Sequence, residues 1–419
     1  MVGVSASKKS PSRRRFLGLA AATIGGLPTL AWGQAAPRLR RYNTPFYVLQ
    51  TNVEEDLARE AAVRMTAIAH EYSNRTSGFS GRTPRGMDFH LYADQQSYTL
   101  AGGTPGSAGV FQSRWRGDTF VDGRLMAFLQ GDTFDARKET WRTIQHEGFH
   151  QFSAIAIGGR KPPWLEEGLA DVFGHSEFTG DSFVSGVAPE SEVKVLKAAI
   201  EGGQAVPFEQ LMLLSHEAWN AAMSGALYLQ SWSMAYFLLY GEGGRYLRPT
   251  EQFVGRIGQG QPWQAAFVDC FGQPAGFQDA WARWWTAQPA DLSKLDYLAA
   301  TLRKLTSFAA RSELGGVQVE TFDVLRSFNI AMPDAVWLPP GLLAEALEEA
   351  DAHARSDGGT WSIEMREVPE PAFRRVGEVR PDRRPSVVYR AADGTAYRGT
   401  YDVSRREIES IDIAAEPAG

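Results

Sequence analysis

Hydrophobic positions along the first third of the chain switch between strand-like and helix-like spacing. Residues 45–50 are expected to form a strand, and residues 88–93 alternate apolar and polar positions, which predicts a second strand. Residues 53–72 instead space their apolar positions for a helix, at Leu57, Ala61, Met65 and Ile68. A loop rich in Gly, Pro and Ser follows at 102–109, and two short strands are expected after it, at 119–121 and 125–129, on either side of Asp122-Gly123. The first third therefore predicts an α/β arrangement.

The middle of the chain, from Asp135 to Ala287, has mostly helical spacing. Glycine runs predict its breaks, at Gly158-Gly159, Gly202-Gly203 and Gly241 to Gly244. Further helices are expected at 292–311 and 340–354. The last part predicts strands at 361–368, 387–390 and 395–403, the final two joined as a hairpin across Asp393-Gly394.

The order of these elements predicts an α+β fold, in which a small mixed β-sheet packs on a mostly helical part. A small C-terminal α/β module, richer in strands, is expected to follow. The predicted divisions are a targeting segment at 1–35, an α/β part at 36–133, a helical part at 134–290, a helical segment at 291–358 and a β-rich module at 359–419.

The composition fits a globular protein and excludes several classes. Of the 419 residues, 43% are hydrophobic and 22% charged, so a large core can form. The single cysteine, Cys270, excludes an intrachain disulfide and a cysteine-rich metal site. The net charge is −6 although the first 35 residues carry five bases and no acid, which leaves the remainder more acidic still and disfavours nucleic acid as a partner.

The N-terminus carries the features of an export signal. A basic flank, Ser12-Arg13-Arg14-Arg15, precedes a mildly apolar run at 18–32 and the small-residue sites around Gly33 and Ala35. This segment resembles a twin-arginine signal, which implies a periplasmic or secreted protein. No cysteine follows the run for lipid attachment, and no uncharged apolar stretch long enough to span a bilayer occurs downstream, so no membrane anchor is expected.

The strongest chemical signal is His146-Glu147-Gly148-Phe149-His150, which matches the zinc-peptidase pattern H-E-x-x-H. Residues four apart lie on one face of a helix, so His146 and His150 can bind one metal ion. Glu147 would then lie beside the metal, where it can act as general base on a metal-activated water. The structural alternative is a pair of histidines that only form hydrogen bonds on a half-buried helix.

A third ligand is expected on the next predicted helix, which begins near Pro163. Sixteen residues separate His150 from Glu167, which leaves room for the first helix to end and a second to pack beside it. Asp171, one turn further, lies on the same face as Glu167 and can accept the second N–H of a zinc-bound histidine. Glu166 lies about 100° away around the helix, so Glu167 is the preferred ligand.

These two segments together resemble the gluzincin metallopeptidases, including the aminopeptidase N family and related bacterial peptidases. The resemblance rests on H-E-x-x-H followed by Trp164-Leu165-Glu166-Glu167-Gly168-Leu169-Ala170, and more weakly on the segment that begins at Tyr228. It implies a mixed sheet over the metal-binding helix, zinc as cofactor, a peptide or protein substrate, and a Tyr228 phenol that stabilises the oxyanion. The G-x-M-E-N segment of the aminopeptidases is absent, so exopeptidase specificity is not implied.

Several alternatives remain open at the level of sequence. The protein can be a secreted, non-catalytic zinc-containing binding or scaffold protein, or a zinc amidase that acts on cell-wall material. The segment Gly123 to Gly131 is a candidate edge strand for peptide binding. Surface or core hydrogen bonding is expected for the other histidines, which are His70, His90, His175, His216 and His353. The oligomeric state and side-chain preference are left undetermined.

Overall fold

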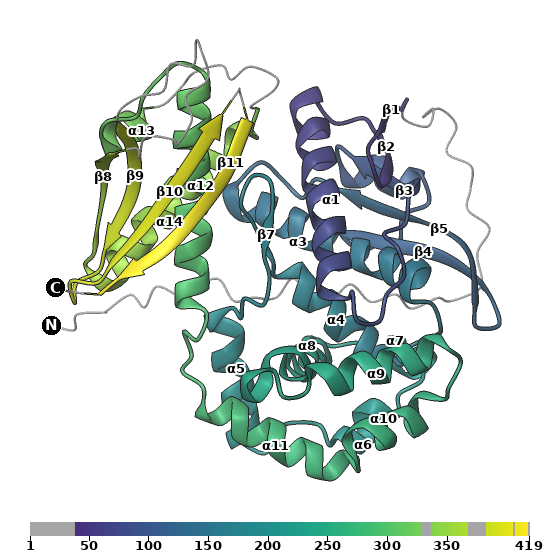
Figure 1. Cartoon of the computed structure of the whole chain (residues 1–419). Helices are drawn as coiled ribbons and strands as arrows, with labels where there is room; N and C mark the ends of the chain where they lie inside the picture. Colours follow the sequence, from purple (N-terminus) through teal and green to yellow (C-terminus); the bar gives the residue numbers. More distant parts are fainter. Residues whose placement is uncertain (1–37, 328–336, 368–382, 405–406, 418–419) are drawn as a thin grey trace, which may run out of the picture.

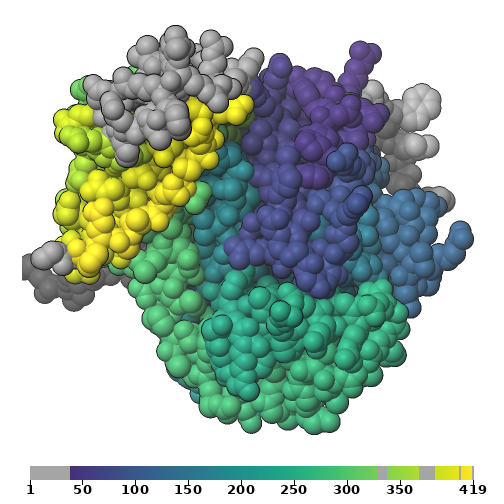
Figure 2. Space-filling view, in the orientation of Figure 1, coloured from purple at the N-terminus to yellow at the C-terminus, as the bar shows by residue number. Residues whose placement is uncertain are grey.

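The computed structural model describes residues 38–327, 337–367, 383–404 and 407–417, so the predicted signal at 1–35 lies outside the described residues. The described residues form the predicted α+β fold, with a mixed sheet, a helical body and a C-terminal antiparallel sheet (Figure 1). In Figure 2 the N-terminal part, in purple and blue, lies above the green helical body and beside the yellow C-terminal strands. Among the described helices, none is both long and apolar enough to cross a membrane.

The N-terminal sheet has five strands in the order β1-β2-β3-β5-β4. Strands β2, β3 and β5 run parallel, and β1 and β4 pair antiparallel at the two edges. Helices α1 and α3 bury one face around Leu49, Phe89 and Leu125, whereas the other face carries a small cluster under α2. The elements are β1 (Arg40–Asn43), β2 (Tyr47–Thr51), α1 (Glu55–Arg75), β3 (Met87–Tyr92), α2 (Gln95–Leu100), β4 (Gly109–Arg116), β5 (Thr119–Phe128) and α3 (Phe134–Phe152).

The structure corrects two predictions in this sheet. The two short strands expected around Asp122-Gly123 are one continuous strand, β5, and the turn lies at Gly117, where φ is +59°. Strand β4 was not predicted; it pairs with β5 along its whole length and occupies the edge of the sheet. The prediction that Gly123 to Gly131 is the edge strand is therefore wrong, because β3 and β4 flank β5 on both sides.

The helical body begins where α3 ends. A single π-helical turn, η1, continues α3 to Ile157, and Gly158 and Gly159, both with positive φ, then break the chain as predicted. Breaks also occur at the other two predicted glycine runs. The elements are η1 (Ser153–Ile157), α4 (Pro163–Gly174), β6 (Glu177–Phe178), β7 (Phe183–Val184), α5 (Glu190–Glu201), α6 (Phe208–Met212), α7 (His216–Ala222), α8 (Gly225–Tyr240), η2 (Gly241–Gly244), α9 (Leu247–Gly258), α10 (Trp263–Phe271) and α11 (Pro274–Ala287).

Helix α12 connects the helical body to the C-terminal sheet. It packs on β9, β10 and β11 of a four-stranded antiparallel sheet in the order β11-β10-β9-β8, and β9 and β10 form the predicted hairpin. Strand β11 and the short helix α13 were not predicted. The elements are α12 (Lys294–Leu314), α13 (Phe322–Arg326), α14 (Pro340–Asp357), β8 (Thr360–Glu367), β9 (Arg383–Arg390), β10 (Ala396–Ser404) and β11 (Glu407–Glu416).

A buried ion cluster joins the C-terminal helices to the rest of the molecule. The fully buried ammonium of Lys304 on α12 lies 2.6 Å from Glu345 and 2.8 Å from Glu349, both on α14. Glu177 lies 3.8 Å from the same ammonium and 2.9 Å from Lys138 of α3. Loss of one partner from such a buried cluster costs about 3–5 kcal/mol, because the remaining charges stay uncompensated.

Candidate metal centre

Helix α3 presents the two histidines of the motif on one face. The side chain of Thr133 caps the helix by accepting a hydrogen bond from the N–H of Ala136, at 3.3 Å, and Asp135 lies in the first turn, where a negative charge stabilises the helix. One turn separates His146 from His150, and their Nε2 atoms lie 3.0 Å apart. The helix therefore directs two imidazole nitrogens at one point.

Helix α4 brings Glu167 to the same point. Pro163 opens this helix at a position where a missing N–H costs nothing. The Glu167 Oε2 atom lies 3.3 Å from Nε2 of His146 and 3.5 Å from Nε2 of His150. The side chain of Glu166 points elsewhere, with Oε2 3.6 Å from Nε2 of His216. Of the two adjacent glutamates, Glu167 is the one that lies beside the histidines.

The spacing of these three ligand atoms fits a zinc ion. Zinc bonds of 2.0–2.2 Å in a tetrahedron place neighbouring ligand atoms about 3.3–3.6 Å apart. The separations in this site are 3.0, 3.3 and 3.5 Å. The donor set, two imidazoles and one carboxylate, is the one that catalytic zinc sites with three protein ligands use. The side chains are only 12–19% exposed, so the ligand atoms are recessed from the surface.

Asp171 orients the first histidine. Its Oδ1 lies 2.9 Å from Nδ1 of His146, so Nδ1 donates to the carboxylate and the lone pair of Nε2 faces the site. This is the role expected for Asp171. Arg142, one turn before His146 on α3, was not predicted from the sequence. Its charge interacts with that of Asp171, and its guanidinium donates to Glu192 at 3.1 Å. Arg142 lies four residues before His146, and this spacing could have indicated that both side chains share one face of α3.

The charges of the site favour a cation. Burial lowers the pKa of an imidazole, but Asp171 and then Glu167 outweigh this effect and raise the pKa of His146 well above its usual value. Burial also lowers the pKa of His150, but the negative charge of Glu167 outweighs this effect, so the pKa of His150 is raised. Burial raises the pKa of the Glu167 carboxyl, but the two imidazoles lower it far more. Positive charge is thus stabilised where the ligand atoms meet.

Glu147 lies beside this point and is held by the edge of the sheet. Its Oε2 accepts a hydrogen bond of 2.7 Å from the backbone N–H of Phe111 on β4. Strand β4 runs close to α3 here, since a Cβ built on Gly109 would lie 2.7 Å from Thr143 and 3.4 Å from Cγ of Glu147. One oxygen of Glu147 is therefore fixed, and Oε1 remains to accept a proton.

Tyr228, in the first turn of α8, lies near His146 of α3. Its ring centroid lies 6.5 Å from that of His146 and 5.6 Å from that of Trp219. Burial, together with the charges of Glu167, Asp171 and Glu147, raises the pKa of the phenol well above its usual value, so the hydroxyl keeps its proton. The phenol can donate a hydrogen bond near the candidate metal position.

A glycine allows α4 and α8 to approach closely. A Cβ built on Gly168 would lie 2.3 Å from the backbone oxygen of Ser231. Only glycine lets the helix that carries Glu167 lie this close to the helix that carries Tyr228. Gly168 is thus a positioning residue, which from the sequence was known only as part of the family motif.

The other titratable clusters of the described residues are structural. His175 is buried and lies 3.1 Å from Glu192, His90 contacts Asp88, and His353 lies 3.4 Å from Thr301, which agrees with the hydrogen-bonding roles expected. His70 is exposed and packs edge-on against Phe46. A second group of potential metal ligands, Glu177, Glu345 and Glu349, surrounds the ammonium of Lys304, which already supplies the positive charge.

Part of the chain is similar to one protein family. The model of DUF1570, described as a protein of unknown function, matches residues 140–253. The matched segment runs from the middle of α3 into α9 and includes each of the site residues discussed, which are His146, Glu147, His150, Glu167, Asp171 and Tyr228. No curated protein matches the chain. The part of the chain that is similar to DUF1570 is thus the part that builds the candidate metal centre.

Proposed function

We propose that the protein is an exported zinc-dependent metallopeptidase of gluzincin type that hydrolyses peptide bonds. The observation that carries this proposal is the convergence of His146, His150 and Glu167, with ligand atoms within 4.8 Å of one another. Glu147 follows His146 on α3, and its charge acts on His150. Three protein ligands leave one position open, as in catalytic zinc sites, whereas structural zinc sites close all four.

In the proposed mechanism the water is activated by zinc, and side chains of the protein transfer the proton. Zinc, when bound, supplies a Lewis acid and lowers the pKa of a coordinated water towards neutrality. Glu147 takes the proton of the attacking water on Oε1, while the N–H of Phe111 holds Oε2. Glu147 then returns this proton to the leaving amine nitrogen, so that the carboxylate is regenerated.

Two further side chains support the same step. The Tyr228 phenol stays protonated and donates a hydrogen bond to the carbonyl oxygen as negative charge develops there. Asp171 accepts a hydrogen bond from the Nδ1–H of His146, which keeps the lone pair of Nε2 available for the metal.

Zinc content and chelation test the proposal directly. Protein purified without a histidine tag should contain close to one zinc per chain and should cleave a complex peptide library. Removal of the metal with a chelator should abolish cleavage, and zinc should restore it. A folded protein that neither contains nor takes up zinc would overturn the proposal. A zinc-loaded protein that cleaves no peptide would favour the binding protein, and cleavage of cell-wall amides alone would favour the amidase.

Export is tested by the paired arginines of the proposed signal. Replacing Arg13 and Arg14 by lysine should retain the precursor in the cytoplasm, because the resemblance to a twin-arginine signal rests on this pair. Cell fractionation and N-terminal sequencing of the exported protein provide the measurement. Unchanged export of the double-lysine variant, or an exported protein that still begins at Met1, would contradict the assignment.

A further inference from the structure

Three aromatic rings form a row on one face of the β4–β5 hairpin. Phe111 stacks on Phe120 with centroids 6.1 Å apart and planes at 30°, and Trp115 meets Phe120 edge-on at 5.5 Å. All three are half-buried. Within the described residues they pack on one another and join neither of the two hydrophobic cores. The row is therefore apolar surface that the fold itself leaves partly uncovered.

The hairpin is shaped to hold these rings. Gly123 lies in the middle of β5, opposite Ser113, and a Cβ built there would lie 2.7 Å from the ring of Phe111. The indole N–H of Trp115 donates to Oγ of Ser113 at 3.0 Å, which orients the third ring. The hairpin projects past the helices at the right of Figure 1.

The row starts at the candidate catalytic base. The N–H of Phe111 points away from β5, because it donates to Glu147 at 2.7 Å. Backbone groups alternate in direction along a strand, so Ser113 also directs its N–H and C=O to the open edge of β4. An extended peptide that pairs with this edge places every second side chain on the face that carries the rings.

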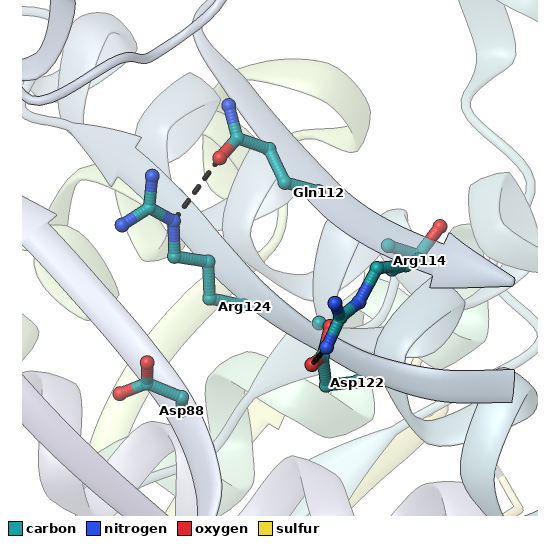
Figure 3. Close-up of a pocket in the computed structure, with 7 residues that line it drawn as sticks. Asp88, Gln112, Arg114, Asp122 and Arg124 are labelled. Carbon is teal, nitrogen blue, oxygen red and sulfur yellow. Dashed lines mark hydrogen bonds and ion pairs between the residues drawn. The ribbon is translucent and has the colours of Figure 1, made fainter.

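The opposite face of the hairpin is polar. Gln112 accepts a hydrogen bond from Arg124 there, at 3.0 Å, and Arg114 pairs with Asp122 (Figure 3). Asp88 of β3 lies on the same side. The two faces thus differ in chemistry. The residue that contacts Glu147, Phe111, carries its side chain on the aromatic face.

We propose that Phe111, Trp115 and Phe120 form a subsite that selects peptide substrates with a large apolar side chain, aromatic above all, at one fixed position beside the scissile bond. The inference rests on the proposed peptidase function and names its substrate class. A peptide is the occupant because the open edge of β4 supplies main-chain donors and acceptors, and the rings supply the apolar surface that an alternating side chain meets.

The test compares cleavage-site preferences of the full-length protein. A proteome-derived peptide library is cleaved by the wild type, by Trp115→Ala/Phe120→Ala and by Gln112→Ala, a control on the same hairpin but on its polar face. The wild type should enrich Phe, Tyr, Trp or Leu at one position. For two peptides that differ only by Phe or Ala there, kcat/KM should differ by at least about tenfold. This ratio should fall to about twofold or less in the double variant and stay unchanged in Gln112→Ala.

Each outcome is decisive. An unchanged Phe-to-Ala ratio in the double variant, with cleavage retained, overturns the subsite and leaves the peptidase function intact. A wild type that cleaves no peptide overturns both. If the double variant fails to fold, as judged by circular dichroism and zinc content, Trp115→Ala alone decides, since the ratio must fall for the proposal to stand. Phe120→Leu, which keeps an apolar side chain, should retain most of the preference.

Discussion

Glu147→Gln should abolish peptide hydrolysis while zinc stays bound. The substitution keeps the shape of the side chain and the carbonyl oxygen that accepts the N–H of Phe111, but it removes the group that takes up a proton. The ligands His146, His150 and Glu167 are untouched, so zinc content and Tm should match the wild type. Loss of a general base lowers the rate by roughly 10²–10⁴-fold, and kcat/KM on one defined peptide measures it.

A matched control separates this effect from a general change of charge on α3. Glu139→Gln alters a half-buried glutamate two turns earlier on the same helix, away from the ligand atoms, and should leave kcat/KM unchanged. Equal activity of Glu147→Gln and the wild type would show that Glu147 is not the base. A Glu147→Gln protein that has lost its zinc would instead place this residue among the groups that hold the metal.

The centre of the site could be predicted because helical geometry links its residues locally. His146 and His150 lie one turn apart on α3, and Glu167 and Asp171 one turn apart on α4, so each pair shares a face wherever its helix packs. The glycines at 158 and 159 marked the end of the first helix. The sixteen residues between His150 and Glu167 left room for α4 to pack beside α3, and the family resemblance supported the same arrangement.

The edge of the sheet could not be predicted in the same way. Asp122-Gly123 has the composition of a turn, yet Gly123 lies inside β5, where the ring of Phe111 takes the place of a side chain. Strand pairing and register are set by contacts between segments distant in sequence, so no local pattern revealed that the N–H of Phe111 meets Glu147. The pairing of Arg142 with Glu192, fifty residues apart, was hidden for the same reason.

Glu167→Ala should remove most zinc affinity, whereas Glu166→Ala should retain it. The carboxylate of Glu167 lies 3.3 and 3.5 Å from the two Nε2 atoms, while that of Glu166 lies 3.6 Å from His216. Both variants lose one half-buried negative charge from adjacent positions of α4, so each controls for the other. Competition with a chromophoric chelator at fixed pH measures affinity, because protons compete with zinc for the ligands.

Asp171→Asn should fall between these two variants. An amide in place of the carboxylate still contacts Nδ1 of His146 but no longer carries the charge that strengthens the histidine as a ligand. Changes in such outer partners weaken metal binding by roughly 10- to 100-fold, and Glu167→Ala should exceed this loss because a ligand atom itself is removed. If Glu166→Ala loses more zinc affinity than Glu167→Ala, the metal binds through the other glutamate and α4 is rotated about its axis in the zinc-bound protein.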